Sequence, residues 1–384
     1  MNRAIRTTVA FLLIVRLVDE TTGFLAPSSV EQFRSDLGIG YGIAGAMFVA
    51  YGCGGLFGVL AVARSDGKSR KTVTWTGAMV LAGSLAIVGA AQSAPWLLVG
   101  AFLDATGATM LVHGGEISIA NALAAAGAGH QLERVLARSN VFAVIGDATG
   151  PLIVAATRAA GVGWRPLFFA VAILVALYGI VLSRLTFPEP VVAVAEIGER
   201  LVPIHRQGAV WLVALAAAAT MPLDEAYLAT VLAFAEVRQG FSSSGAALLG
   251  ATFVAGGLVS LTALTGVIAR TSMATLLTVS ALGLSAVMAV AAIGPGWVLV
   301  PVGLVHSGLL MATWLALQTT VLRANPGREG ATKVIVEVLE TASFGVVVAI
   351  GVLADRAGLR WAMAAFAVLP LLLVPVATAY RRRQ

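Results

Sequence analysis

Adjacent acidic residues inside apolar stretches are the feature of this sequence that most clearly suggests chemistry. Asp19 and Glu20 follow Arg16 in an apolar run, and a second pair, Asp224 and Glu225, occurs 205 residues later. If these runs cross a membrane, ionisable side chains there are costly and mark binding sites or proton pathways. A carboxylate shielded from water can exchange protons near neutral pH, whereas its ionised form binds a cation. The two pairs are therefore predicted to carry protons or a cationic substrate.

Arg16 is the predicted charge partner of the first pair. Arg16 and Asp19 are three residues apart, so on a helix they share a face and can form an ion pair. Such a pair reduces the cost of burying either charge, and a purely structural role for Asp19 is the alternative. Glu20 is expected to point about 100° away from Asp19, free to meet another group.

Further candidates for the proton or substrate path lie in other apolar runs. His113 and Glu116 have helical spacing, which suits a proton relay or a metal ligand, with hydrogen-bonded packing as the alternative. The remaining candidates are single ionisable residues within predicted spans, and Asp147 and Glu340 occupy matching places in the two halves of the chain. They are Asp104, Asp147, His306 and Glu340.

The elements that must position these residues follow from composition. The 384 residues are 59% hydrophobic and 11% charged, far from the balance of a soluble domain. A spanning helix needs about 20 mostly apolar residues. The sequence predicts an all-α membrane protein with twelve spans, near 7–30, 40–63, 73–92, 96–120, 135–159, 165–186, 209–235, 245–268, 272–293, 297–322, 333–354 and 360–380.

Several classes are disfavoured by what the sequence contains. Cys53 is its one cysteine, so it has no cysteine-based metal site and no disulfide framework. It carries no nucleophile motif and no phosphate-binding loop, so an enzyme is not expected, and neither is a cofactor or a resident metal. The net charge of +6 arises from residues between the spans, so nucleic acid is not predicted as a partner.

The distribution of basic residues predicts orientation. With both termini cytoplasmic, 18 of the 25 Lys and Arg residues fall on the inner side and 6 on the outer side. This is the bias of the positive-inside rule, and it requires an even number of spans. The chain is therefore expected in a cytoplasmic membrane of bacterial type, with the lipid bilayer as its surroundings.

The chain also repeats internally. At the offset of 205 residues that aligns the two acidic pairs, Gly45 meets Gly250 and Phe48 meets Phe253. A parallel repeat of six helices is typical of transporters whose halves are related by an axis along the membrane normal. The predicted organisation is a six-helix bundle at 1–187, a cytoplasmic linker at 188–208 and a second six-helix bundle at 209–384.

Three local motifs carry a resemblance to a known family. The loop after the second span contains Asp66, Arg70 and Lys71 in the places of a G-x-x-x-D-R-x-G-R-[RK] signature, and the fifth span contains Gly146, Gly150 and Pro151 as G-x-x-x-G-P. With Gly163-Trp164-Arg165 before the sixth span, the chain resembles the major facilitator superfamily, and the G-x-x-x-G-P core resembles that of its drug/proton antiporters.

The resemblance implies a fold and a set of roles. In that family, helices 1, 4, 7 and 10 line a central cavity, which would bring both acidic pairs beside the substrate path. The loop with Asp66, Arg70 and Lys71 would hold one conformation closed on the cytoplasmic side. Ala101 stands where the family's fourth helix usually has an arginine linked to proton relay, so that role does not carry over.

These observations predict a secondary transporter that works by alternating access. We expect a proton-coupled antiporter that exports a small amphipathic or cationic compound and functions as a monomer. A proton-linked importer of a small organic solute is the alternative, because the helix-4 arginine is missing. A divalent metal transporter using Asp19, Glu20, His113 or His306 is a third possibility, although the sequence contains no dense ligand cluster.

Overall fold

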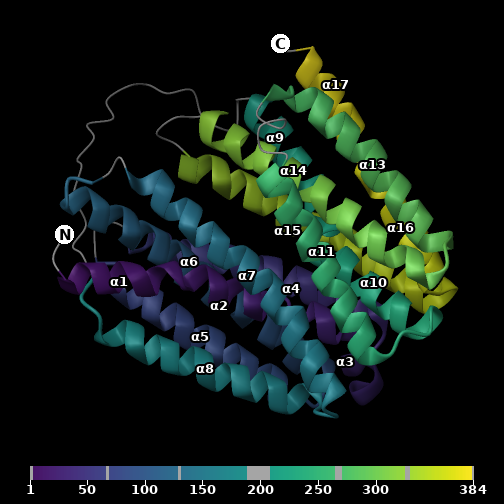
Figure 1. The fold of residues 1–384 in the computed structure, drawn as a ribbon, viewed down its shortest axis with the longest axis horizontal. Helices are drawn as coiled ribbons and strands as arrows, with labels where there is room; N and C mark the ends of the chain where they lie inside the picture. The colour runs from purple at the N-terminus through teal and green to yellow at the C-terminus, as the bar shows by residue number, and fades with distance from the viewer. Residues whose placement is uncertain are drawn as a thin grey trace. The chain divides into compact units, whose positions relative to one another are not determined.

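The computed structural model describes residues 3–65, 69–128, 131–187, 208–263, 270–324 and 329–382. Within these ranges the chain forms helices and no strand, as predicted (Figure 1). Eleven helices of the described part are long and apolar enough to cross a membrane. Their continuous apolar composition explains this, because a backbone in lipid must satisfy its hydrogen bonds within the segment.

Most predicted spans coincide closely with single helices. These are α4 (Tyr41–Ala63), α5 (Lys71–Ala90), α6 (Ala94–Ala125), α7 (Leu132–Ala159), α8 (Trp164–Arg184), α11 (Ser243–Ala263), α13 (Met273–Ile293), α14 (Leu299–Ala324, after the short turn η5 at Gly296–Val298) and α15 (Glu329–Ala357).

The first predicted span is broken rather than continuous. It consists of α1 (Arg3–Leu13) and α2 (Val15–Gly23), followed by η1 (Pro27–Ser29) and α3 (Val30–Leu37). Neither α1 nor α2 is long enough to cross a membrane alone, and together they supply the first of the twelve predicted spans. The break at Ile14 precedes Arg16 by two residues, so the charged residues of this span lie at the start of a separate helical segment.

Two later spans are interrupted at proline. The seventh consists of α9 (Gly208–Thr220), η4 (Met221–Leu223) and α10 (Glu225–Arg238), and the twelfth of α16 (Leu359–Val368), η6 (Leu369–Leu372) and α17 (Leu373–Arg381). Pro222 is the second residue of η4, and Pro370 is the second residue of η6. Proline has no N–H to donate and its ring clashes with the preceding turn, which accounts for both interruptions.

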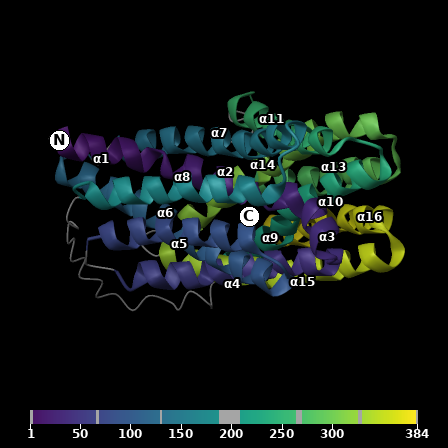
Figure 2. The ribbon, with the colours of Figure 1, turned by 90° about the horizontal axis from the view of Figure 1, so that it is seen from below.

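The chain divides into two compact units. Unit 1 comprises Met1–Ala26, Cys53–Gly150 and Ala160–Arg200. In it α5 packs against both α6 and α8, and α1 and α2 pack against α6 (Figure 2). Gly77 on α5 and Gly107 on α6 allow these two helices to approach closely, since a Cβ on Gly77 would lie 2.8 Å from the carbonyl oxygen of Gly107. Small residues are typical of such helix crossings in membranes.

Unit 2 comprises Pro27–Gly52, Pro151–Ala159 and Leu201–Gln384. Helices α11 and α14 pack together, as do α9 and α15, while α13 contacts α14, α16 and α17. Its core includes Val213, Leu277, Leu317 and Leu373, all nearly inaccessible to solvent. Because α4 and α7 run from one unit into the other, these units differ from the predicted halves, whose boundaries stay a prediction. Of the predicted linker, residues 188–207 lie outside the described residues.

Candidate functional site

The charged residues of α2 and α6 meet in unit 1. The Nε and Nη2 atoms of Arg16 lie 3.2 and 3.1 Å from Oε1 of Glu116, a residue 100 positions away in the sequence. The Nη1 atom of Arg16 lies 3.3 Å from Oε1 of Glu20 and 3.7 Å from Oδ2 of Asp19. Among the described residues, one guanidinium therefore contacts three carboxylates. We call Arg16, Asp19, Glu20, His113 and Glu116 the α2–α6 cluster.

The position of Glu20 corrects one expectation. The sequence predicted that Glu20 points away from the Arg16–Asp19 pair, but Glu20 lies closer to the guanidinium than Asp19 does. The physical reason is that positions i and i+4 share a helix face as well as positions i and i+3, and a long arginine side chain reaches both.

Partial exposure distinguishes this cluster from a buried structural ion pair. The side chains of Arg16, Glu20 and Glu116 are 27%, 26% and 31% exposed, whereas that of Asp19 is 16% exposed. His113, one helical turn before Glu116, places Nδ1 3.7 Å from the second oxygen of that carboxylate. The cluster thus carries a net negative charge when its carboxylates are ionised and His113 is neutral, and its charged side chains are only partly buried.

Asp104 lies on α6 about three turns before Glu116. Its Oδ1 accepts a hydrogen bond of 3.2 Å from Oγ of Ser84 on α5. Ser84 is fully buried, and its hydroxyl also lies 2.7 Å from the Leu81 carbonyl oxygen, so its single proton is shared between two acceptors. Sequence reasoning did not single out Ser84, because a lone serine in an apolar helix gives no signal of its partner.

The G-x-x-x-G-P motif of α7 packs against α2. A Cβ on Gly146 would lie 2.8 Å from the Leu17 carbonyl oxygen and 2.9 Å from Cβ of Glu20, and one on Gly150 would lie 2.7 Å from Cβ of Phe24. The motif therefore sets how closely α2, with its charged residues, approaches α7. Asp147 follows Gly146 on the same helix, and Pro151 lies within α7 in unit 2, where it packs against Gly250.

The second acidic pair has a different local setting from the first. Asp224 links η4 to α10 with ψ −118°, and Glu225 is the first residue of α10. Pro222 in η4 accounts for the interruption, whereas the equivalent residues of α2 are helical. Glu340 lies within α15, where its carbonyl accepts a hydrogen bond from Ser343. Asp224, Glu225 and Glu340 all belong to unit 2.

His306 lies among aromatic rings in the core of unit 2. Its ring centroid is 4.7 Å from that of Tyr227 and 5.3 Å from that of Phe253, and its side chain is 1% exposed. This environment fits a packing role as well as a proton-carrying one, and within the described ranges His306 has no ring or hydrogen-bond contact with another predicted site residue.

The loop that resembles the family signature is described in part. Asp66 lies outside the described residues. Arg70 precedes α5 and is buried, and it donates to the Val62 carbonyl at 2.5 Å and to Oγ of Ser65. It thereby satisfies the Val62 carbonyl in the last turn of α4, where a cation is favourable. Lys71 is the first residue of α5.

The His, Cys, Asp and Glu side chains of the described residues do not form a metal centre. Among the described residues, no group of three or more His, Cys, Asp or Glu side chains has the geometry to hold a metal ion. With its carboxylates facing a single arginine, the α2–α6 cluster is suited instead to binding a cation or exchanging protons.

The fold and this intramembrane charge cluster define a polytopic helical membrane transporter. The sequence model of the Major Facilitator Superfamily matches residues 10–337. The chain therefore belongs to the Major Facilitator Superfamily, and it is a secondary transporter. No curated protein sequence matches the chain significantly.

Solved structures share this fold at low sequence identity. A mutant form of the nucleoside transporter NupG superposes with a TM-score of 0.79 at 12% identity, covering 98% of this chain and 99% of that one. A bacterial homologue of the human lysosomal transporter Spinster, in an inward-facing and unoccupied conformation, gives 0.76 at 15%, covering 100% and 98%. A POT family transporter in complex with a thioalcohol-conjugated peptide gives 0.77 at 10%, covering 98% and 96%.

Proposed function

We propose that this transporter is a proton-coupled antiporter that exports a small amphipathic or cationic compound by alternating access. It would act as a monomer in a cytoplasmic membrane of bacterial type, with both termini inside. The observation that carries this proposal is the α2–α6 cluster, in which Arg16 contacts three partly exposed carboxylates.

The charge balance of the cluster supports this choice of substrate. When Asp19, Glu20 and Glu116 are ionised, one guanidinium leaves two negative charges to be balanced by another cation. A proton or a cationic substrate can supply that charge, and competition between the two is the physical basis of antiport. In this scheme Asp104, Asp147, Asp224, Glu225 and Glu340 are further candidates for carrying protons.

A proton-linked importer of a small organic solute remains the alternative. It is favoured by Ala101, which leaves α6 without the arginine associated with antiport in related exporters. In this structure Arg16 of α2 supplies a cation to α6, where it contacts Glu116. That arrangement favours the antiporter, because a cation still faces a carboxylate on α6.

Substrate-induced proton flux in proteoliposomes tests the proposal. The purified chain would be challenged with a library of lipophilic cations, including ethidium and tetraphenylphosphonium, with a pH-sensitive dye inside the vesicles. We expect at least one cation to drive proton movement in the opposite direction, and Asp19→Asn, Glu116→Gln and Asp224→Asn to abolish the coupled flux. Asp36→Asn removes an exposed carboxylate of α3 and serves as the matched control.

Three results would contradict parts of the proposal. Coupled export that survives Asp19→Asn and Asp224→Asn would exclude the acidic pairs as the coupling site. Proton and solute movement in the same direction would identify the importer. Flux driven by a divalent metal without proton movement would favour metal transport.

A further inference from the structure

One end of unit 2 joins segments that are far apart in the sequence. Residues 27–52 and 151–159, which the sequence places in the first half of the chain, pack in this unit with helices of the second half. Within it η1 and α3 contact α10, and α10 and α15 each contact α16. We call this region, which includes the beginning of α4 and the end of α7, the α3 end of unit 2. The distribution of Lys and Arg residues along the sequence predicts that the α3 end lies on the outer side of the membrane.

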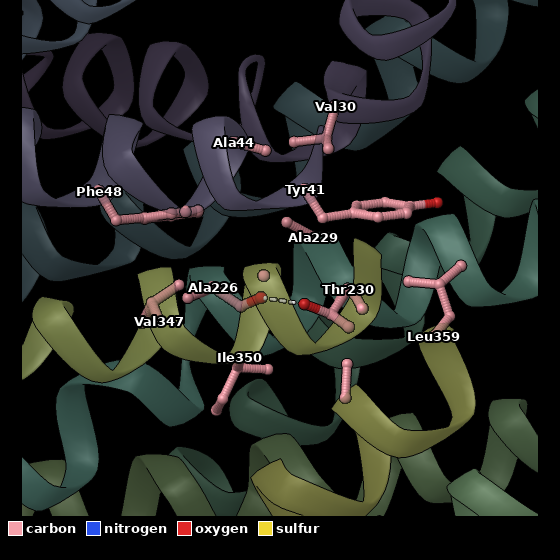
Figure 3. A pocket seen from close by; sticks show the side chains of 14 residues that line it. Val30, Tyr41, Ala44, Phe48, Ala226, Ala229, Thr230, Val347, Ile350 and Leu359 are labelled. Carbon is pink, nitrogen blue, oxygen red and sulfur yellow. Dashed lines mark hydrogen bonds between the residues drawn. The ribbon is translucent and has the colours of Figure 1, made fainter. Parts of the chain in front are cut away.

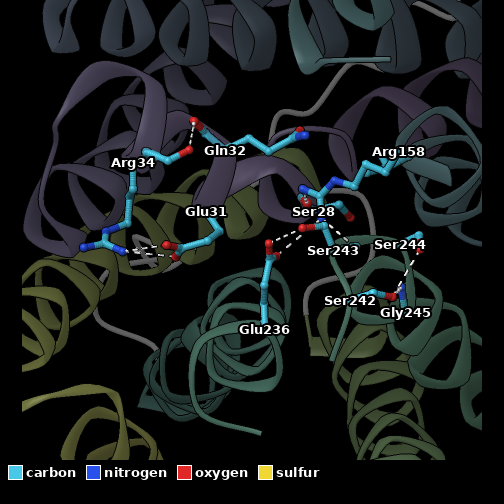
Figure 4. A network of polar contacts seen from close by, with 12 residues as sticks. Ser28, Glu31, Gln32, Arg34, Arg158, Glu236, Ser242, Ser243, Ser244 and Gly245 are labelled. Atoms are coloured by element: carbon cyan, nitrogen blue, oxygen red, sulfur yellow. Dashed lines mark hydrogen bonds and ion pairs between the residues drawn. The ribbon is translucent and has the colours of Figure 1, made fainter. Parts of the chain in front are cut away.

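Arg158, near the end of α7, ties three segments together at the α3 end. Its Nη2 donates to the Ser28 carbonyl at 2.7 Å, and its Nη1 donates to the Ser243 carbonyl at 2.8 Å (Figure 4). The same Nη1 lies 3.7 Å from Oε2 of Glu236 on α10, and the Ser243 hydroxyl donates to the other oxygen of that carboxylate. The Arg158 side chain is 5% exposed, so losing these partners would leave a desolvated charge.

Asp355 makes a second connection of the same kind. It lies in the last turns of α15, and its Oδ1 and Oδ2 accept hydrogen bonds from the backbone N–H groups of Tyr41 and Gly42 at 2.7 and 2.9 Å. These two N–H groups begin α4 and have no partner within that helix. A carboxylate at a helix N-terminus is stabilised by both the hydrogen bonds and the helix dipole. One residue of the second half therefore caps a helix of the first half.

The helices between these two connections are closely packed and apolar. A Cβ on Gly45 of α4 would lie 2.8 Å from the Val347 carbonyl oxygen on α15, so the two backbones are nearly in contact. Beside them is a cavity of about 30 Å³, lined largely by apolar side chains such as Phe48, Ile350 and Leu359 (Figure 3). That volume holds about one or two water molecules. The helices thus leave little free space between them at the α3 end.

From these contacts we infer that Arg158 and Asp355 form a two-point latch that holds the α3 end shut, and that both points release during transport. Alternating access requires each end of the pathway to open in turn. Opening at the α3 end separates segments of the first half from those of the second. That movement withdraws Arg158 from Glu236 and Ser243, and Asp355 from the start of α4. The inference does not depend on the substrate or on the coupling ion.

Arg34 provides a matched control at the same end. It is also a cation near the surface of unit 2, but the structure gives it partners on its own stretch of chain. Its Nη1 lies 3.0 Å from both carboxylate oxygens of Glu31, and its guanidinium lies 3.4 Å from the centroid of the Tyr41 ring. Removing Arg34 changes charge and local packing without breaking a contact to the second half.

Labelling of a reporter cysteine tests the latch. In a Cys53→Ser background, Ala44→Cys places a thiol on a buried position of α4 that lines this cavity. The rate of reaction with a bulky polyethylene glycol maleimide would be measured in detergent, where membrane orientation has no influence. We expect Arg158→Gln and Asp355→Ala each to raise this rate at least about fivefold by shifting the population toward the open state, while Arg34→Gln leaves it unchanged.

More conservative substitutions provide a second test if Arg158→Gln or Asp355→Ala prevents insertion of the protein into the membrane. Arg158→Lys and Asp355→Asn retain a donor and an acceptor at the two points and are expected to give intermediate labelling rates. Labelling at the unmodified rate in every Arg158 and Asp355 variant that folds, judged by size-exclusion chromatography, would overturn the inference. An equal rise in Arg34→Gln would also overturn it, because the effect would then be a general loosening of this end.

Discussion

At the scale of single residues, Arg16 governs the electrostatics of the α2–α6 cluster. It bridges two helices whose contacting residues are 100 positions apart, and among the described residues it gives Glu116 its closest cationic partner. A carboxylate that loses such a partner must be neutralised or solvated, because an unpaired charge at membrane depth is unfavourable. The cluster is therefore expected to behave as a unit rather than as a sum of pairs.

A double-mutant cycle on Arg16→Gln and Glu116→Gln tests this coupling. Residues in one salt-bridge network commonly show interaction energies of about 0.5–3 kcal/mol, so the two substitutions together should destabilise less than the sum of their separate effects. The measurement is the melting temperature of each purified variant in detergent. Asp36→Asn combined with Arg16→Gln is the control pair and should be additive, since Asp36 is an exposed residue of another helix, α3. Additivity of Arg16→Gln with Glu116→Gln would show that their contact contributes nothing to stability.

At the scale of elements, the packing of α7 on α2 positions the charged residues. Gly146 and Gly150 both face α2, and neither leaves room for a side chain at the present helix separation. Close approach of backbones through small residues is a principal source of helix association in membranes. A side chain added here must push α2, and with it Glu20, away from α7.

Alanine substitutions along α7 and α5 test this role of the motif. Gly146→Ala and Gly150→Ala should destabilise the protein by about 1–3 kcal/mol through overpacking, and should reduce transport of the cation identified in the proteoliposome screen. Gly83→Ala on α5 is the matched control, since a Cβ there meets nothing within 4 Å and alanine favours a helix. Thermal stability and flux would be compared for the three variants. A similar response in all three would mean that the α2–α7 contact has no special importance.

At the scale of the whole molecule, the distribution of basic residues predicts both termini on the cytoplasmic side. The prediction rests on 18 inner against 6 outer residues, a bias that orients the short loops of membrane proteins during insertion. The same prediction places the α3 end, with its Arg158 and Asp355 latch, on the outer side.

Fusion reporters at the C-terminus test the orientation. A green fluorescent protein fusion should be fluorescent and an alkaline phosphatase fusion inactive, because only the first matures in the cytoplasm and only the second in the periplasm. The same reporters placed after residue 163, in the loop before α8, should give the opposite result. An active phosphatase at the C-terminus would contradict the predicted topology and would place the latch on the inner side.

The class of this protein and most of its helices could be predicted from the amino-acid sequence. Continuous apolar runs predicted helices such as α4 and α13 close to their observed bounds, because in lipid the backbone has no alternative partners. The spacing of Arg16 and Asp19 likewise predicted a contact that exists, since it depends only on the geometry of one helix. Breaks were harder to predict, as at Ile14, because interruption of a helix depends on the neighbours that satisfy its backbone.

Contacts between residues far apart in the sequence became known from the packing of the helices. Glu116 contacts Arg16, Ser84 contacts Asp104, and Asp355 caps a helix more than 300 residues earlier. None of these pairs has a sequence signal, because their distances depend on how whole helices pack and not on local periodicity. The repeated acidic pair shows the same limit: Asp19 lies within a helix, whereas Asp224 lies at a break beside Pro222. Identical residues at identical offsets thus acquire different surroundings once the helices around them are fixed.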